Sequence, residues 1–356
     1  MTKGIKGTKG SVLVLGATGQ VGRAAVTALA ADGWEVRAVS RGGGRDDTWP
    51  AKVRTVSADR EDDAALAAAL GDGCDVLVDM VAYGQNHARQ LRGFADRIGS
   101  AVVISSGAVY EDDQGRSFDT QDEPDGFPRY PVPILETQRT VAPSDATYGT
   151  RKVALERELL AAGDELPVTL LRAGAIHGPY CPGPRELYFV KRALDRRPVR
   201  ILAYNGESRF HPVHVSNIAE LIRLAAAKPG SRVLNAGDPE VPTVAEISAG
   251  VDAALGVPSE TVLVDGPAPV GAVGLTPWGE DRPIVFDMSA AERELGYRAV
   301  TSYAASLPAT VEWLARRIEG RDIREWRDWA EIFRNLANYE DDWFDYAAED
   351  SWLKQR

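Results

Sequence analysis

Apolar and amphipathic segments alternate along the first two thirds of the chain. Short runs rich in Val, Ile, Leu and Ala have the length and composition of buried strands, at residues 11–15, 35–40, 53–57, 76–81, 101–105 and 168–172. Stretches with helical spacing of apolar residues lie between them, at 20–32, 62–71, 87–99 and 148–163. A further strand is expected at 232–235. The alternation predicts an α/β fold with a doubly wound parallel sheet and helices on both faces.

The first predicted strand leads into a glycine-rich turn. Gly16, Gly19 and Gly22 follow the apolar run directly and precede a helical pattern. Glycine lets the main chain approach a pyrophosphate closely, and the N-terminus of the following helix favours its negative charge. The context of strand, turn and helix therefore predicts a dinucleotide site.

Tyr148 and Lys152 are separated by one turn of the fourth predicted helix, so their side chains share a face. An ammonium beside a phenol lowers the pKa of the phenol, and such a tyrosine can exchange a proton with a carbinol or ketone during hydride transfer. Ser106 ends the fifth predicted strand at the carboxyl edge of the sheet, where its hydroxyl can orient the reacting oxygen. These three residues are the candidate catalytic residues.

Charge and cysteine usage exclude several classes of function. The 356 residues carry a net charge of -11 without a long basic segment, which argues against a nucleic-acid partner. Cys74 and Cys181 are too few for a metal site and indicate no disulfide framework. Neither a membrane span nor a signal peptide is evident. We expect a cytoplasmic enzyme with a small-molecule substrate and no metal, and leave a homodimer open.

Five motifs follow one another along the chain. They are the glycine loop, Ser-Ser-Gly-Ala-Val-Tyr at 105–110, Tyr148-x-x-x-Lys152, Leu-Arg-Ala-Gly-Ala-Ile-His-Gly-Pro at 171–179, and His-Pro-Val-His-Val at 211–215. From about residue 11 to about residue 314 the chain resembles the extended short-chain dehydrogenase/reductase family of the NAD-dependent epimerase/dehydratase type. The resemblance implies a Rossmann-type sheet with a smaller C-terminal substrate-binding lobe, and Tyr148 as general acid/base.

The resemblance also implies roles for residues outside the catalytic trio. Lys152 would hold the nicotinamide ribose and Ser106 would orient the reacting oxygen. The other implied cofactor contacts are Gly16, Thr18, Gly19, Gln20, Val21 and Gly22 in the phosphate loop, Asp59 and Arg60 beside the adenine, and Ala82 after the fourth strand. The implied substrate contacts are Tyr83, His177, Arg209 and His214. For Arg209 and His214, an ion pair and a structural histidine are equally open interpretations.

Two departures from the family pattern change the expected chemistry. An NAD-preferring member carries Asp or Glu at the end of the second strand, whereas here Ser40 is followed by Arg41, and Arg45 lies nearby. A cation there accommodates a 2′-phosphate, so we expect NADP, with NAD as the alternative. Gly107 and Ala108 occupy the positions where sugar dehydratases place an Asp-Glu pair, so 4,6-dehydratase chemistry is not expected.

The predicted elements divide the chain into three parts. Residues 1–178, with 205–236 returning to them, would form the dinucleotide-binding domain, and 179–204 with 237–319 the substrate-binding lobe. The aromatic and acidic segment 320–356 extends beyond the usual family end. Ile323, Trp326, Trp329 and Phe333 fall at helical spacing there, so they predict an apolar stripe covered by its own domain, by another subunit or by the substrate cleft.

The sequence thus predicts an NAD(P)-dependent oxidoreductase, either a reductase or an epimerase, acting on a sugar-nucleotide-like or polar natural-product substrate. A non-catalytic NADP-binding redox sensor is the first alternative, and an RNA-associated relative of the fold is the second. Intact Ser106, Tyr148 and Lys152 disfavour the sensor, and the acidic charge balance disfavours the RNA-associated relative.

Overall fold

Two compact units make up the protein in the computed structural model, which describes residues 9–321, 327–339 and 342–356. Within the described residues, unit 1 comprises the chain up to Gly174, Val215–Gly237 and Phe286–Val300. Unit 2 comprises Ala175–His214, Asp238–Val285 and the chain from Thr301 onward. The expected boundaries at 178 and 205 therefore move to 174 and 215. The segment 286–300, assigned to the lobe from sequence, belongs to unit 1.

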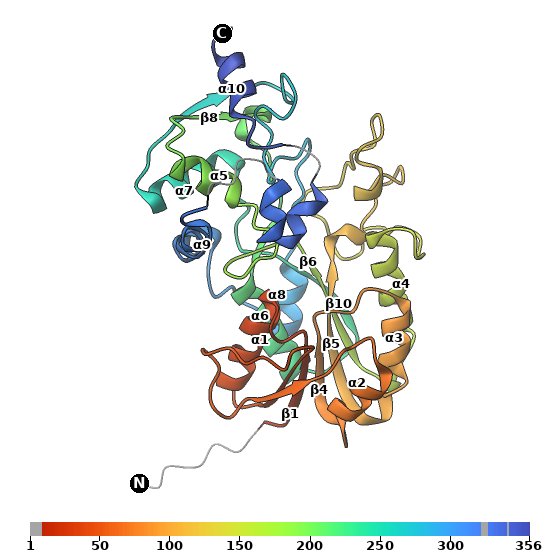
Figure 1. Ribbon diagram of the computed structural model, residues 1–356. Helices are drawn as coiled ribbons and strands as arrows, with labels where there is room; N and C mark the ends of the chain where they lie inside the picture. The colour runs from red at the N-terminus through yellow and green to blue at the C-terminus, as the bar shows by residue number, and fades with distance from the viewer. Residues whose placement is uncertain (1–8, 322–326, 340–341) are drawn as a thin grey trace. The chain divides into compact units, whose positions relative to one another are not determined.

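Unit 1 is built on a seven-stranded parallel sheet (Figure 1). The strands are β1 (Ser11–Leu15), β2 (Glu35–Ser40), β3 (Arg54–Ser57), β4 (Cys74–Asp79), β5 (Ile98–Ser106), β6 (Val168–Ala173) and β10 (Arg232–Ala236). Their order is β10-β6-β5-β4-β1-β2-β3. The predicted doubly wound α/β fold is confirmed. The order reverses between β1 and β4, and ligands of such sheets bind at the carboxyl ends of the strands beside this point.

Helices cover both faces of this sheet (Figure 1). One layer contains α1 (Gln20–Ala31), α6 (Val215–Ala227) and α8 (Ser289–Leu295), and the other contains α2 (Asp63–Leu70), α3 (Gln85–Arg92) and α4 (Tyr148–Leu160). The second layer buries Leu66, Leu91 and Leu155 against the strands. The expected helix at 87–99 is wrong in its second half, because α3 ends at Arg92 and Ile98 already pairs with Cys74 in the sheet.

Helices and two pairs of short parallel strands form unit 2. The helices are α5 (Leu187–Leu194), α7 (Val244–Leu255), α9 (Tyr303–Ile318) and α10 (Tyr346–Leu353). The strand pairs are β7 (Ala175–His177) with β9 (Pro212–His214), and β8 (Val199–Leu202) with β11 (Glu260–Leu263). None of the described helices in either unit combines the length and apolar character that a membrane crossing requires.

The described part of the C-terminal segment packs into the core of unit 2. Trp329 and Phe333 are buried there with Trp343 and Phe344. The Arg192 side chain of α5 is buried next to these residues. Its guanidinium donates to the carbonyl of Trp343 and pairs with Glu349. Packing on its own domain is therefore what the described residues show. Ile323 and Trp326 lie outside the described residues.

Candidate active site

The glycine turn between β1 and α1 brings the main chain to the carboxyl edge of the sheet. Gly16 has a φ of +80° and donates its N–H to the carbonyl of Val39, so the turn is attached to β2. The residue that precedes α1 is Gly19, and no side chain caps this helix N-terminus. The first-turn N–H groups and the helix dipole favour an anion at this position. This cradle fits the pyrophosphate of a dinucleotide.

Gly22 is predicted to tolerate no side chain. A Cβ at this position would lie 2.2 Å from the carbonyl oxygen of Gly16 and 2.7 Å from the Cα of Ala17. Ala is favoured over Gly in a helix by about 1 kcal/mol, but overpacking costs about 1–3 kcal/mol, so the steric effect dominates. Gly22→Ala should lower the melting temperature and weaken dinucleotide binding. Gly42→Ala is the control, because nothing lies within 4 Å of its Cβ; an unchanged Gly22→Ala protein would contradict the close approach.

Ser106, Tyr148 and Lys152 come together in unit 1. Ser106 ends β5, and Tyr148 is the first residue of α4. Ser106 lies close enough to the Tyr148 phenol to influence its pKa, and Tyr148 is 43% exposed. Lys152 lies one turn further along α4, buried, with its ammonium 5.7 Å from the Tyr148 ring centroid. A hydroxyl, a partly exposed tyrosine and a buried cation are thus grouped at the carboxyl edge of the sheet.

The electrostatics of this group differ from the expectation. Burial lowers the pKa of Lys152 to about 8, although Asp79 and Glu156 oppose this shift. Partial burial raises the pKa of Tyr148, and the neighbouring Ser106 hydroxyl opposes that shift. The expected lowering of the Tyr148 pKa by Lys152 is wrong for this structure. The ammonium instead donates to the carbonyls of Ala82, at 2.6 Å, and Ile104, at 2.9 Å.

A buried ion pair that was not predicted from the sequence lies next to the candidate catalytic residues. Glu156 follows Lys152 by one further turn of α4 and accepts hydrogen bonds from Arg172 at 2.7 and 3.0 Å. The Ser105 hydroxyl, next to Ser106 in the chain, donates to the same carboxylate at 2.6 Å. The spacing Tyr148, Lys152, Glu156 places all three on one face of α4, and this was the available sequence signal.

The end of β2 presents a free cation. The Arg41 guanidinium is exposed and has no hydrogen-bond or ion-pair partner in the described part of the chain, while its carbonyl accepts from Ser57 Oγ at 2.9 Å. Arg45, in contrast, donates to the carbonyls of Trp49, Pro50 and Val53 and so holds its own loop together. Of these two arginines, Arg41 is the one whose guanidinium is placed to meet a ligand.

The residues expected around the adenine and nicotinamide divide into accessible and inaccessible side chains. Asp59 is exposed and accepts from the Glu61 N–H at 3.1 Å. The expectation that Arg60 contacts the adenine is corrected for its side chain, which is buried, pairs with Asp79 and donates to Gln90 Oε1 at 2.7 Å. The Ala82 methyl is likewise buried. At both positions only the main chain remains to contact a cofactor.

The expected substrate residues lie in different surroundings. Tyr83 is half exposed in unit 1, with its ring centroid 5.1 Å from the Lys152 ammonium. His177 and His214 belong to unit 2 and are buried: His177 Nε2 lies 2.7 Å from Asp238 Oδ2, and the His214 N–H donates to Asp238 Oδ1 at 2.7 Å. Burial, together with the neighbouring His177, lowers the pKa of His214 to about 4. The structural interpretation of these histidines fits their geometry better than substrate contact.

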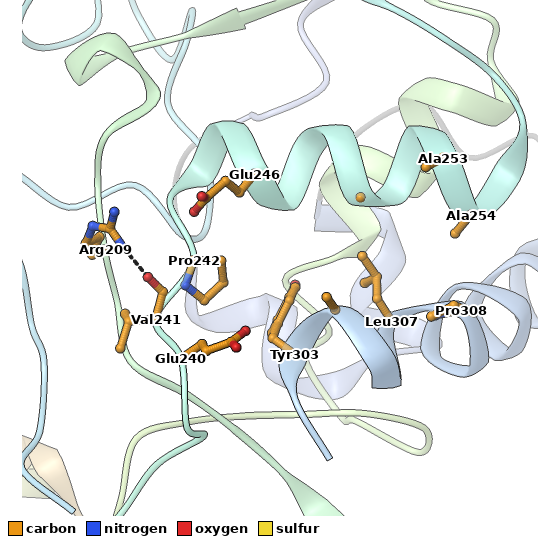
Figure 2. Close-up of a pocket in the computed structure, with 12 residues that line it drawn as sticks. Arg209, Glu240, Val241, Pro242, Glu246, Ala253, Ala254, Tyr303, Leu307 and Pro308 are labelled. Atoms are coloured by element: carbon orange, nitrogen blue, oxygen red, sulfur yellow. Dashed lines mark hydrogen bonds between the residues drawn. The ribbon is translucent and has the colours of Figure 1, made fainter.

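Arg209 borders a cavity of about 830 Å³ in unit 2, between α7 and α9 (Figure 2). Its guanidinium donates to the carbonyl of Val241, and the carboxylates of Glu240 and Glu246 line the same cavity. Small and apolar residues of the two helices complete the wall, among them Ala253, Ala254, Leu307 and Pro308. None of the three candidate catalytic residues lines this cavity.

Comparison with known proteins agrees with this architecture. Residues 12–237 match the model of the NAD dependent epimerase/dehydratase family, whereas a search of curated proteins gave no significant match. MoeE5 in complex with UDP-glucuronic acid and NAD is 25% identical, with 86% of this chain and 99% of that chain covered and a TM-score of 0.64. The UDP-glucose 4-epimerase from Thermotoga maritima with UDP-glucose is 20% identical, with coverages of 87% and 100% and a TM-score of 0.65. The UDP-N-acetylglucosamine 4-epimerase from Bacillus cereus is 17% identical, with coverages of 86% and 99% and a TM-score of 0.66. These structural similarities support the fold. Because the family model matches residues 12–237, which is more than half of the chain, this chain belongs to the NAD dependent epimerase/dehydratase family.

Proposed function

We propose that this protein is a nicotinamide-dependent epimerase acting on a sugar nucleotide. The observation that carries the proposal is the grouping of Ser106, Tyr148 and Lys152 beside a glycine cradle, in a chain of this family. The relatives MoeE5 and the two 4-epimerases, which carry UDP-sugars in their names, support the substrate class. A bound dinucleotide would supply a reversible hydride acceptor.

The residues of the chain would handle the proton. Ser106 would hold the oxygen of the reacting carbinol while Tyr148 accepts its proton during oxidation. Tyr148 would return a proton to that oxygen during reduction, so a sugar whose carbonyl intermediate turns over would leave with inverted configuration. The Lys152 ammonium, held by the carbonyls of Ala82 and Ile104, would bind the nicotinamide ribose.

Net reduction is the second candidate, and Arg41 favours it. A free guanidinium at the end of β2 suits the 2′-phosphate of NADP, the dinucleotide of most reductive reactions. The raised pKa of Tyr148 favours its protonated form, which suits donation to a developing alkoxide. We propose NADP as the preferred dinucleotide, with NAD as the alternative supported by the NAD-bound relative.

The deciding experiment identifies the dinucleotide and then follows the hydride. The nucleotide that co-purifies would be released by denaturation and identified, and the holoprotein incubated with UDP-sugars deuterated at the reacting carbon. An epimerase should invert the carbon, retain the deuterium and leave the absorbance at 340 nm unchanged. Consumption of NADPH with a ketone substrate would establish the reductase instead. A protein that binds no dinucleotide would overturn both.

Arg41→Ala tests the dinucleotide preference. We expect NADPH binding to weaken about tenfold or more, because a charge-assisted contact to the phosphate is lost, and NADH binding to stay within about twofold. Dissociation constants from fluorescence titration of both dinucleotides give the ratio. Arg54→Ala is a matched control, because Arg54 is an exposed arginine of β3. Equal weakening of both dinucleotides would show that Arg41 does not read the 2′-phosphate.

A further inference from the structure

His87 and Glu61 lie outside the motifs described above, yet they join two loops of the proposed dinucleotide site. One loop follows β3 and contains Asp59, Arg60 and Glu61, and the other follows β4 and contains Ala82 and Tyr83. Both loops lie at the carboxyl edge of the sheet, where ligands of such folds bind. The contact between His87 and Glu61 therefore connects two loops that border the proposed dinucleotide site.

His87 uses both ring nitrogens. It is the third residue of α3, and its Nδ1 accepts the main-chain N–H of Tyr83 at 2.8 Å. Its Nε2 lies 3.0 and 3.1 Å from the two carboxylate oxygens of Glu61. Because Nδ1 accepts, the proton of the neutral ring is on Nε2, which donates to Glu61. The carboxylate thereby selects the tautomer that can receive the Tyr83 N–H.

The Tyr83 N–H and the Ala82 carbonyl belong to the same peptide group. The carbonyl oxygen accepts a hydrogen bond from the Lys152 ammonium at 2.6 Å, while the N–H donates to His87. A peptide group is planar, so holding its N–H fixes the direction of its carbonyl. His87 therefore sets the orientation of one of the two carbonyls that hold the buried Lys152 ammonium.

A second residue on this face of α3 also contacts the loop that follows β3. Gln90, one turn after His87, donates to the Arg60 carbonyl at 2.9 Å and accepts from its guanidinium at 2.7 Å. Arg60 in turn pairs with the buried Asp79 at the end of β4. With the β3 loop already held by Gln90 and Asp79, the specific effect of His87 falls on the peptide group between Ala82 and Tyr83.

We propose that His87 is a positioning residue of the dinucleotide site, which acts by orienting the peptide group between Ala82 and Tyr83 and, through it, the Lys152 ammonium. The proposal rests on the proposed function, since Lys152 is expected to contact the nicotinamide ribose. It assigns to a histidine of α3 a role that is exerted through the Ala82–Tyr83 peptide group and Lys152.

Two amide substitutions separate the contacts of His87. Asn places a side-chain oxygen near the position of Nδ1, so His87→Asn keeps an acceptor for the Tyr83 N–H and gives up Glu61. Gln reaches the position of Nε2, so His87→Gln keeps a donor for Glu61 and gives up the Tyr83 N–H. Dissociation constants of NADH and NADPH and the melting temperature would be measured for wild type and both variants.

We expect His87→Gln to bind the preferred dinucleotide about tenfold more weakly, as loss of one hydrogen bond gives, and His87→Asn to bind within about threefold of wild type. Equal affinities for all three proteins, or equal losses in the two variants, would overturn the positioning role. If a variant fails to fold, the melting curve shows it. Glu61→Leu then tests the contact between the two loops from the loop after β3. Weaker dinucleotide binding is expected for this variant, and unchanged binding would contradict the proposal. Wild type that binds neither dinucleotide would instead overturn the proposed function.

Discussion

Replacing Tyr148 with Phe is expected to lower turnover by about 10²–10⁴-fold, the range over which a positioned acid or base contributes. The substitution removes the phenol hydroxyl, which is the proposed proton donor and acceptor, and the ring itself would remain in place. Dinucleotide binding should persist, because the glycine cradle and Lys152 are untouched. Conversion of the UDP-sugar into its epimer under single-turnover conditions, with dinucleotide binding measured in parallel, separates the chemical step from the affinity.

Tyr83→Phe is the matched control for Tyr148→Phe. Tyr83 is also half exposed, and its ring also faces the Lys152 ammonium, at 5.1 Å against 5.7 Å for Tyr148. Only Tyr148 of this pair is the proposed acid/base, so loss of the Tyr83 hydroxyl should change turnover far less. Full activity of Tyr148→Phe, or equal losses in both variants, would show that the proton takes another route.

Replacing Glu156 with Leu should lower the free energy of unfolding by about 3–5 kcal/mol, because it leaves the guanidinium of Arg172 buried without its counter-charge. Arg172 and Glu156 are 7% and 3% exposed, so water cannot replace the lost carboxylate. Ser105 loses its acceptor in the same substitution. Urea denaturation of wild type and variant under identical conditions measures the difference.

Two further variants show whether the burial of the pair causes this loss. In the double variant Glu156→Leu with Arg172→Met, no charge is left unpaired, and most of the lost stability should return. Glu312→Gln breaks an exposed ion pair with Arg316 on α9, and it should cost no more than about 0.5 kcal/mol. A double variant as unstable as Glu156→Leu alone would mean that packing, and not the unpaired charge, determines the cost.

Periodicity was enough to predict the architecture of unit 1. Buried parallel strands are apolar runs, as in β1, β4, β5 and β6, and this pattern allowed them to be predicted from the sequence. The end of α3 was not legible, because Phe94 and Ile98 continue an apolar pattern past Arg92 although Gly93 lies between them. The assignment of 286–300 to unit 1 has no local signal either. It depends on tertiary contacts, which include those of α8 with α6 and β10 and the packing of Phe286 against the Tyr110 ring, with a centroid distance of 5.9 Å.

The candidate catalytic residues were predictable because their chemistry is tied to short spacings. The four-residue step from Tyr148 to Lys152 and the strand end at Ser106 both translate directly into position. The partners of a long cationic side chain do not follow from spacing. Arg41 and Arg60 look alike in the sequence, yet one is exposed and the other is buried against Asp79. His177 and His214 were similarly ambiguous, because burial and the Asp238 contacts are tertiary features.

The interleaving of the two units determines when each can be completed during synthesis. β10, at one edge of the sheet, lies in the stretch 215–237, and α8, which covers one of its faces, lies in the stretch 286–300. Residues 238–285 of unit 2 lie between these stretches in the chain, so about five sixths of the chain must be synthesised before all parts of unit 1 are present. No single cut in the chain separates the two units, and a gene fragment ending at the family match would encode a sheet that lacks one of its covering helices. Fusion or truncation designs must therefore treat the pair as one folding product.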